Sequence, residues 1–149
     1  MKTLILLSFL LHSLIAYEVG SKVDEKLVSL LKIDDNRTYI IDFFASWCHS
    51  CEKEIPELNR LNRSLDRSRY ELIGVSIDKD IQKAKAFERS LHVSFRVLND
   101  TTHEIVSAFK PLGMPSLYIV KEKKVLHVII GAVDNINEVI VSQLGVHND

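Results

Sequence analysis

The alternation of apolar and polar positions along the chain predicts an α/β domain. Two near-continuous apolar runs, at 39–45 and 72–77, have the β-branched and aromatic content of strands covered on both faces. Shorter strands are predicted at 95–98, 117–120 and 125–130. The tight polar turn at 121–124 implies that the last two strands form an antiparallel hairpin.

Helical patterns alternate with these strands. Residues 48–66 place Cys51, Ile55 and Leu58 on one face and charged side chains on the other. Asp80 is predicted to cap a second helix, whose inward residues are Ile81, Ala84, Phe87 and Leu91. Other helices are expected around 23–31, at 102–109 and from Asp134 onward. This order predicts a mixed central sheet with helices on both faces.

The N-terminal segment is set apart from the domain. After a basic Met1-Lys2, residues 3–16 are almost entirely apolar, yet this run is shorter than the roughly 20 residues that span a bilayer. We therefore expect residues 1–16 to be a signal peptide or an N-terminal anchor, and residues 17–149 to be the domain. The expected location is periplasmic, secreted or membrane-anchored, with the periplasm preferred.

Composition narrows the class of protein. A chain of 149 residues with 46% hydrophobic and 26% charged residues suits one globular domain. The formal net charge of −1 supplies no field that would gather nucleic acid. We expect a monomer without a nucleic-acid partner.

The chain has two cysteines, Cys48 and Cys51, and they lie three residues apart. A disulfide over so short a loop stabilises little, so reactivity explains the pair better than stapling does. A buried strand ends just before the pair and a helix begins there, and residues i and i+3 of a first helical turn are neighbours. The helix N-terminus favours a thiolate. Because Cys48 is expected at the exposed tip and Cys51 on the inward face, Cys48 should attack a substrate disulfide and Cys51 should resolve the mixed disulfide.

A zinc site is the alternative for such a pair. It requires four ligands, but the chain has no second CxxC, and its other histidines, such as His92 and His103, show no ligand spacing. We therefore predict no metal and no cofactor other than the Cys48–Cys51 disulfide itself.

The run FFASWCHSC, with Pro56 five residues after Cys51, resembles the active site of thioredoxin-fold proteins. The longer pattern WCxxCxxEIPEL, with an added strand and helix before the final hairpin, resembles the exported TlpA/ResA-like branch, which includes the reductases of cytochrome c maturation. The resemblance covers most of 38–145. It implies a thioredoxin fold with an inserted strand and helix, and thiol–disulfide oxidoreductase activity.

Two residues away from the cysteines acquire roles through this resemblance. Met114-Pro115 corresponds to the cis-proline that lies against the disulfide and exposes backbone for substrate pairing; an ordinary loop proline is the alternative. Asp42 corresponds to a buried acid that assists proton transfer at the resolving cysteine; a solvent-facing carboxylate at a strand edge is the alternative. Burial would raise the pKa of Asp42 toward a range useful for acid–base work.

The two residues that flank Cys48 are further candidates for contacting substrate. Trp47 is expected to pack beside the disulfide and shield part of it; plain core filling is the alternative, and the two roles are compatible. His49, when protonated, would stabilise the Cys48 thiolate, or it is an exposed loop residue. Two departures limit the resemblance: the dipeptide His49-Ser50 has neither proline nor glycine, and Ser116 stands where the cytochrome c reductases often carry an acid.

The leading hypothesis is an extracytoplasmic enzyme that reduces cysteine disulfides of proteins such as apocytochrome c. Because the compartment is oxidising, a membrane electron donor would have to reduce it again. The runner-up is a disulfide oxidant, and a thioredoxin-fold metallochaperone or other binding module is a further alternative. A peroxidase ranks last, because the chain lacks the Pro-x-x-x-Thr-x-x-Cys arrangement of peroxiredoxins.

Overall fold

A computed structural model describes residues 16–145, so nearly all of the predicted leader at 1–16 lies outside the described residues. The strands are β1 (Thr38–Phe44), β2 (Tyr70–Ser76), β3 (Arg96–Asn99), β4 (Ser116–Lys121) and β5 (Lys124–Ile130). The helices are α1 (Glu25–Leu31), α2 (His49–Ser64), α3 (Ile81–Ser90), α4 (Glu104–Phe109) and α5 (Ile136–Leu144). Each predicted strand and helix is present, with ends shifted by one to a few residues.

The strands form one mixed sheet in the order β3-β2-β1-β4-β5. β1 pairs in parallel with β2 and antiparallel with β4, while β2 and β3 are parallel and are joined by α3. The predicted hairpin of β4 and β5 is confirmed. Its two turn residues, Glu122 and Lys123, both have positive φ (50° and 59°), as a two-residue turn that matches the strand twist requires.

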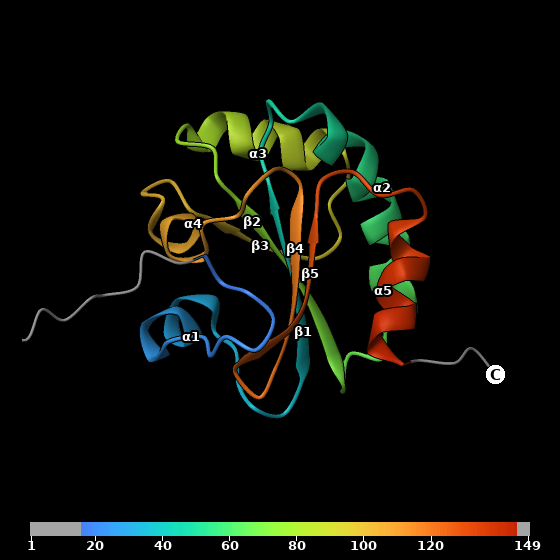
Figure 1. Ribbon diagram of the computed structural model, residues 1–149. Helices are drawn as coiled ribbons and strands as arrows, with labels where there is room; N and C mark the ends of the chain where they lie inside the picture. The colour runs from blue at the N-terminus through green and yellow to red at the C-terminus, as the bar shows by residue number, and fades with distance from the viewer. Residues whose placement is uncertain (1–15, 146–149) are drawn as a thin grey trace, which may run out of the picture.

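Central strand β1 is buried along its whole length, which explains its near-continuous apolar sequence. Because side chains alternate across a strand, Tyr39 and Phe43 enter a core with α1 and α4, and Ile40 and Phe44 enter a second core with α2 and α5. Figure 1 shows α1 and α4 on one side of the sheet and α2 and α5 on the other. The predicted α/β architecture with helices on both faces is confirmed.

Local sequence signals explain most helix ends. Asp80 caps α3 as predicted: its carboxylate accepts hydrogen bonds from the backbone N–H groups of Gln82 (2.9 Å) and Lys83 (3.3 Å). The prediction that Ile81 faces inward is wrong, since its side chain is 40% exposed. Ile81 is the first residue of α3, and the stripe that packs on the sheet begins at Ala84.

Gly74 lets β2 pack closely against its neighbours. A Cβ at this position would lie 2.7 Å from Cε1 of Phe44 and 2.9 Å from Cε2 of Phe95, closer than buried carbon atoms can approach. We expect Gly74→Ala to lower the free energy of unfolding by about 1–3 kcal/mol, the usual cost of overpacking a core. Urea denaturation measures this, and an unchanged midpoint would contradict it.

Candidate active site

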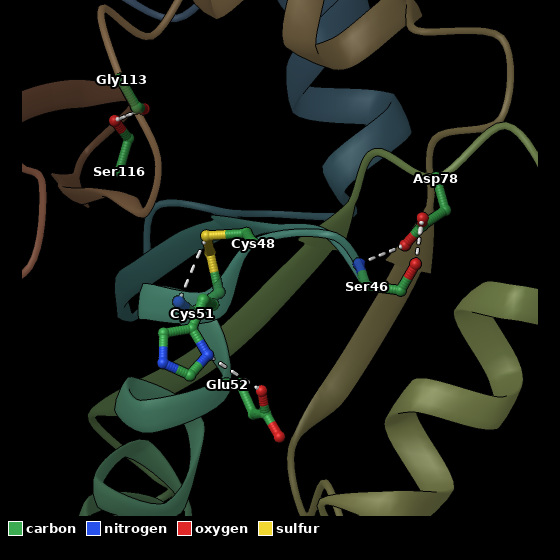
Figure 2. Close-up of a disulfide and its surroundings, with 8 residues drawn as sticks. Ser46, Cys48, Cys51, Glu52, Asp78, Gly113 and Ser116 are labelled. Carbon is green, nitrogen blue, oxygen red and sulfur yellow. Dashed lines mark hydrogen bonds and ion pairs between the residues drawn. A yellow bond between two sulfur atoms is a disulfide. The ribbon is translucent and has the colours of Figure 1, made fainter.

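The two cysteines form a disulfide where β1 passes into α2. Their Cα atoms are 5.3 Å apart. Cys48 is the residue immediately before α2, and its Sγ accepts a hydrogen bond from the backbone N–H of Cys51 at 3.2 Å (Figure 2). Unpaired N–H groups and the helix dipole at this end stabilise negative charge on that sulfur. In the reduced protein, Cys48 is therefore the better nucleophile.

Exposure separates the two sulfurs less sharply than predicted. Cys48 is 7% exposed and Cys51 is 1% exposed, so the predicted order holds but Cys48 is not at an open tip. It packs in the core cluster that includes Ala45 and Cys51. The sequence could not reveal this burial, because the covering side chains come from distant parts of the chain.

The Met114–Pro115 bond is cis, the isomer that the resemblance implies. Met114 packs against the core cluster that contains both cysteines. The turn is held by Ser116, whose hydroxyl donates to the carbonyl of Gly113 at 2.6 Å, and by the carbonyl of Pro115, which accepts from Gly131 N–H at 2.8 Å. Figure 2 shows this loop in the same view as the disulfide. Met114 thus links this loop to the cysteine cluster.

Asp42 is a buried acid on β1, so the alternative of a solvent-facing carboxylate is wrong. Its side chain is 1% exposed, and its Oδ1 has no hydrogen-bond partner among the described residues. It lies between Ile40 and Phe44 in the strand alternation, on the sheet face that α2 covers. Burial raises the pKa of Asp42 well above its ordinary value, and the charge of Glu54 raises it further. The protonated, uncharged form of Asp42 is thus favoured over its carboxylate.

Glu54 is a second buried acid, and the sequence reasoning missed it. Its side chain is 8% exposed, and burial, followed by the charge of Glu57, raises its pKa to about 7. Glu54 follows Cys51 by three residues, so it lies on the same side of α2. That spacing was a signal in the sequence that a charged residue turned toward the core. Two buried carboxyls with raised pKa values, Asp42 on β1 and Glu54 on α2, therefore lie close enough for their charges to interact.

Trp47 and His49 are both exposed. Trp47 is 66% exposed, so the alternative that it fills the core is wrong; it presents an apolar surface next to Cys48, where the prediction placed it beside the disulfide. The side chain of His49 is 77% exposed, and its Nδ1 lies 3.4 Å from the Glu52 carboxylate, one turn along the helix. This is the exposed position that the sequence left open as an alternative for His49.

Asp78 is a third buried acid that sequence reasoning did not single out. It follows β2, is 4% exposed, and accepts hydrogen bonds from Ser46, which lies in the turn before Cys48. The two residues are 32 positions apart in the chain. No short-range pattern links them, so only the pairing of β1 with β2 brings them together.

Residues 14–129 match the AhpC/TSA family, which is more than three quarters of the chain. The chain belongs to the AhpC/TSA family. This membership agrees with the predicted resemblance to thioredoxin-fold proteins.

Curated relatives of this AhpC/TSA family protein are thiol–disulfide oxidoreductases. The ResA protein of Bacillus thuringiensis is 28% identical over 102 residues, which cover 68% of this chain and 59% of ResA. ResA of Oceanobacillus iheyensis is 25% identical over 70% of this chain and 54% of its own length. The chain therefore spans less than two thirds of the length of these relatives.

Solved structures confirm the thioredoxin fold. A thiol:disulfide interchange protein of Chlorobium tepidum described as a DsbE superposes with a TM-score of 0.75 at 20% identity, over 87% of this chain and 96% of the other. StoA from Bacillus subtilis superposes with a TM-score of 0.67 at 19% identity, over 74% of this chain and 84% of its own. At these identities the superpositions establish the fold.

Within residues 16–145, no helix has the length and apolar character needed to cross a membrane. No group of three His, Cys, Asp or Glu side chains in the described part converges in a way that could hold a metal ion.

Proposed function

We propose that this protein is an extracytoplasmic thiol–disulfide oxidoreductase that reduces disulfides in other proteins. The observation that carries the proposal is the Cys48–Cys51 disulfide at the N-terminus of α2, close to the cis Met114–Pro115 loop. The ResA relatives support the class of reaction, because their names describe thiol–disulfide oxidoreductases.

The proposed reaction has two steps. The Cys48 thiolate attacks a disulfide of the substrate protein and forms a mixed disulfide, and one substrate sulfur leaves as a thiolate that takes up a proton. Cys51 then loses its proton and attacks Cys48, which releases the second substrate thiol and forms the Cys48–Cys51 disulfide. Asp42 and Glu54, buried on the Cys51 side of the site with raised pKa values, are suited to accept the Cys51 proton.

A surface for a polypeptide substrate lies beside the cis-proline loop. A groove of about 370 Å³ runs along this loop; its lining comprises Ile77, Val106, Ser107, Lys110, Pro111, Leu112, Gly113 and Met114. Leu112 is 82% exposed and Trp47 is 66% exposed. Exposed apolar side chains on the cis-proline loop and on the residue before Cys48 favour an unfolded or extended protein segment over a small thiol as the substrate.

We propose further that the enzyme acts outside the cytosol, that apocytochrome c is a substrate, and that a membrane protein supplies its electrons. The apolar segment at 3–16 supports export. The resemblance of WCxxCxxEIPEL to the reductases of cytochrome c maturation supports the substrate class, and the oxidising compartment requires the electron donor.

The test is a reduction assay with insulin as a protein disulfide, together with the potential of the Cys48–Cys51 couple. We expect the reduced protein to cleave insulin disulfides and the couple to have a potential near the roughly −270 mV of thioredoxin. A value near −120 mV would make the protein an oxidant. Stoichiometric retention of copper or zinc without insulin reduction would indicate that the protein is a metallochaperone and not an enzyme. Export is measured separately, by the activity of alkaline phosphatase fused after residue 149.

A further inference from the structure

The carboxylate of Asp78 forms hydrogen bonds with the turn that immediately precedes Cys48. Its Oδ2 accepts from the backbone N–H of Ser46 at 2.8 Å, and its Oδ1 accepts from the Ser46 hydroxyl at 2.7 Å (Figure 2). The hydroxyl of Ser76, at the end of β2, donates to Oδ2 at 3.2 Å. Both oxygens are thus occupied by donors, which is the arrangement that an ionised carboxylate requires.

This carboxylate is buried without a cation. The Asp78 side chain is 4% exposed, and among residues 16–145 it takes part in no ion pair. The three hydrogen bonds therefore stabilise its buried negative charge. A buried charge is screened less by solvent and salt than an exposed one, so it acts over a longer distance.

The turn itself is short. The backbone N–H of Cys48 donates to the carbonyl of Ala45 at 3.1 Å, which leaves Ser46 and Trp47 as the two central residues between β1 and α2. Two residues of chain span at most about 7 Å. The Asp78 carboxylate is therefore linked to Cys48 by its hydrogen bonds to Ser46 and by two peptide units, and any movement of Ser46 is passed to Cys48 through those units.

We propose that Asp78 is a positioning residue for disulfide exchange, one that pins the Ser46–Trp47 turn under Cys48 and whose negative charge disfavours the Cys48 thiolate. This inference rests on the proposed function and deepens it, because it concerns the direction of electron flow. The N-terminus of α2 stabilises the thiolate, and Asp78 opposes that effect. A dithiol whose thiolate is less stabilised gives up its electrons more readily, so Asp78 keeps the pair a reductant.

Other ionisable side chains on the surrounding elements contribute to the same field. They include Asp42 on β1, His49, Glu52 and Glu54 on α2, Lys79 after Asp78, His103 before α4, whose Nε2 lies 2.7 Å from the carbonyl oxygen of Ile77, and Lys110 before the cis-proline loop. His49 and Glu52 are paired with each other and exposed to solvent. Burial raises the pKa values of Asp42 and Glu54, which favours the uncharged form of both carboxyls and weakens their contribution to the field at Cys48.

The test compares Asp78→Asn with a matched control, Asp100→Asn. The asparagine has the same shape and still offers an oxygen to the N–H of Ser46, so the first change removes mainly charge. Asp100 is also a buried carboxylate that accepts two backbone N–H groups, those of Ile105 (3.2 Å) and Val106 (2.8 Å), but it caps α4. Both variants lose a buried charge, and only Asp78 adjoins the turn before Cys48.

Equilibration with glutathione is the main measurement. Two glutathione thiols give two electrons and two protons to the protein, the Cys48–Cys51 bond breaks, and one glutathione disulfide forms. We expect Asp78→Asn to raise this equilibrium constant about tenfold, which corresponds to about 30 mV. Alkylation of Cys48 by iodoacetamide at pH 6 should accelerate severalfold. Asp100→Asn should change neither quantity. An Asp78→Asn protein that behaves like Asp100→Asn in both assays overturns the inference.

A second measurement requires no variant. In the reduced wild-type protein, the carboxyl ¹³C resonance of Asp78 should shift as the Cys48 thiol titrates, while that of Asp100 should not; an unmoved Asp78 resonance overturns the inference even if Asp78→Asn does not fold. Failure of the proposed function is a different result. In that case the wild-type protein itself does not reduce insulin, whatever the two asparagine variants do to the glutathione equilibrium.

Discussion

Cys51→Ser is expected to turn the protein into a trap for its substrates. Cys48 remains able to attack, but the mixed disulfide loses the neighbouring thiol that would resolve it. Well-oriented intramolecular groups have effective concentrations of about 10⁵ M or more, so millimolar external thiol should leave resolution slower by more than about a thousandfold. The captured proteins are measured as high-mass bands on non-reducing gels of the native host, and mass spectrometry identifies them.

Cys48→Ser is the matched variant, because it keeps one cysteine of the same pair. It should capture nothing, since Cys51 is 1% exposed and lies behind Cys48 in the helix turn. Capture by Cys48→Ser alone would reverse the two roles. Apocytochrome c among the proteins held by Cys51→Ser would support the proposed substrate, and its absence would direct the search to other secreted proteins with cysteines.

Glu54→Gln is expected to flatten the dependence of stability on pH. Burial raises the pKa of Glu54 from 4.5 to about 7, so the folded protein holds a proton that the unfolded chain releases. Between these two values the folded state binds more protons than the unfolded state, and the free energy of unfolding falls as pH rises. The decrease in the free energy of unfolding caused by Glu54 amounts to about 3 kcal/mol by pH 7.5, and it is absent below pH 4.

Urea denaturation of the oxidised protein at several pH values measures this effect. Relative to wild type, Glu54→Gln should gain about 3 kcal/mol between pH 4 and pH 7.5. Glu52→Gln is the control, because Glu52 is exposed on the same helix and should leave the profile parallel to wild type. The Asp42 carboxyl, whose pKa is also raised by burial, leaves part of the downward slope in place. Parallel profiles for Glu54→Gln and wild type would show that Glu54 is not the buried acid described here.

The position of the cysteine pair in the fold could be predicted from the sequence because it depends on short-range signals. A continuous apolar run predicts a buried strand, and the strand is β1. Two cysteines at i and i+3 after that strand predict a disulfide in the first turn of a helix, and the disulfide joins Cys48 to Cys51 at the start of α2. Asp80 as a cap and the polar turn at 121–124 are likewise short-range signals that the structure confirms.

Exposure and long-range contacts were predicted less well. Cys48 was expected at an open tip and is nearly buried, and the exposure of Trp47 rules out the core-filling alternative that its sequence had left open. The type of a residue does not reveal which distant side chains will cover it. Glu54 was overlooked because the other charged residues of its helix face solvent, although its spacing from Cys51 indicated the inward side.

The sequence by itself determined the order of strands and helices, the place of the cysteine pair and the acid on the central strand, because periodicity and spacing act within a few residues. The tertiary structure alone decided which groups surround the sulfurs. The contact of Asp78 with Ser46 spans 32 positions, and the cis-proline loop reaches the disulfide from more than 60 residues away. Such contacts exist only after β1 has paired with β2 and β4, because that pairing is what brings the three loops to one edge of the sheet.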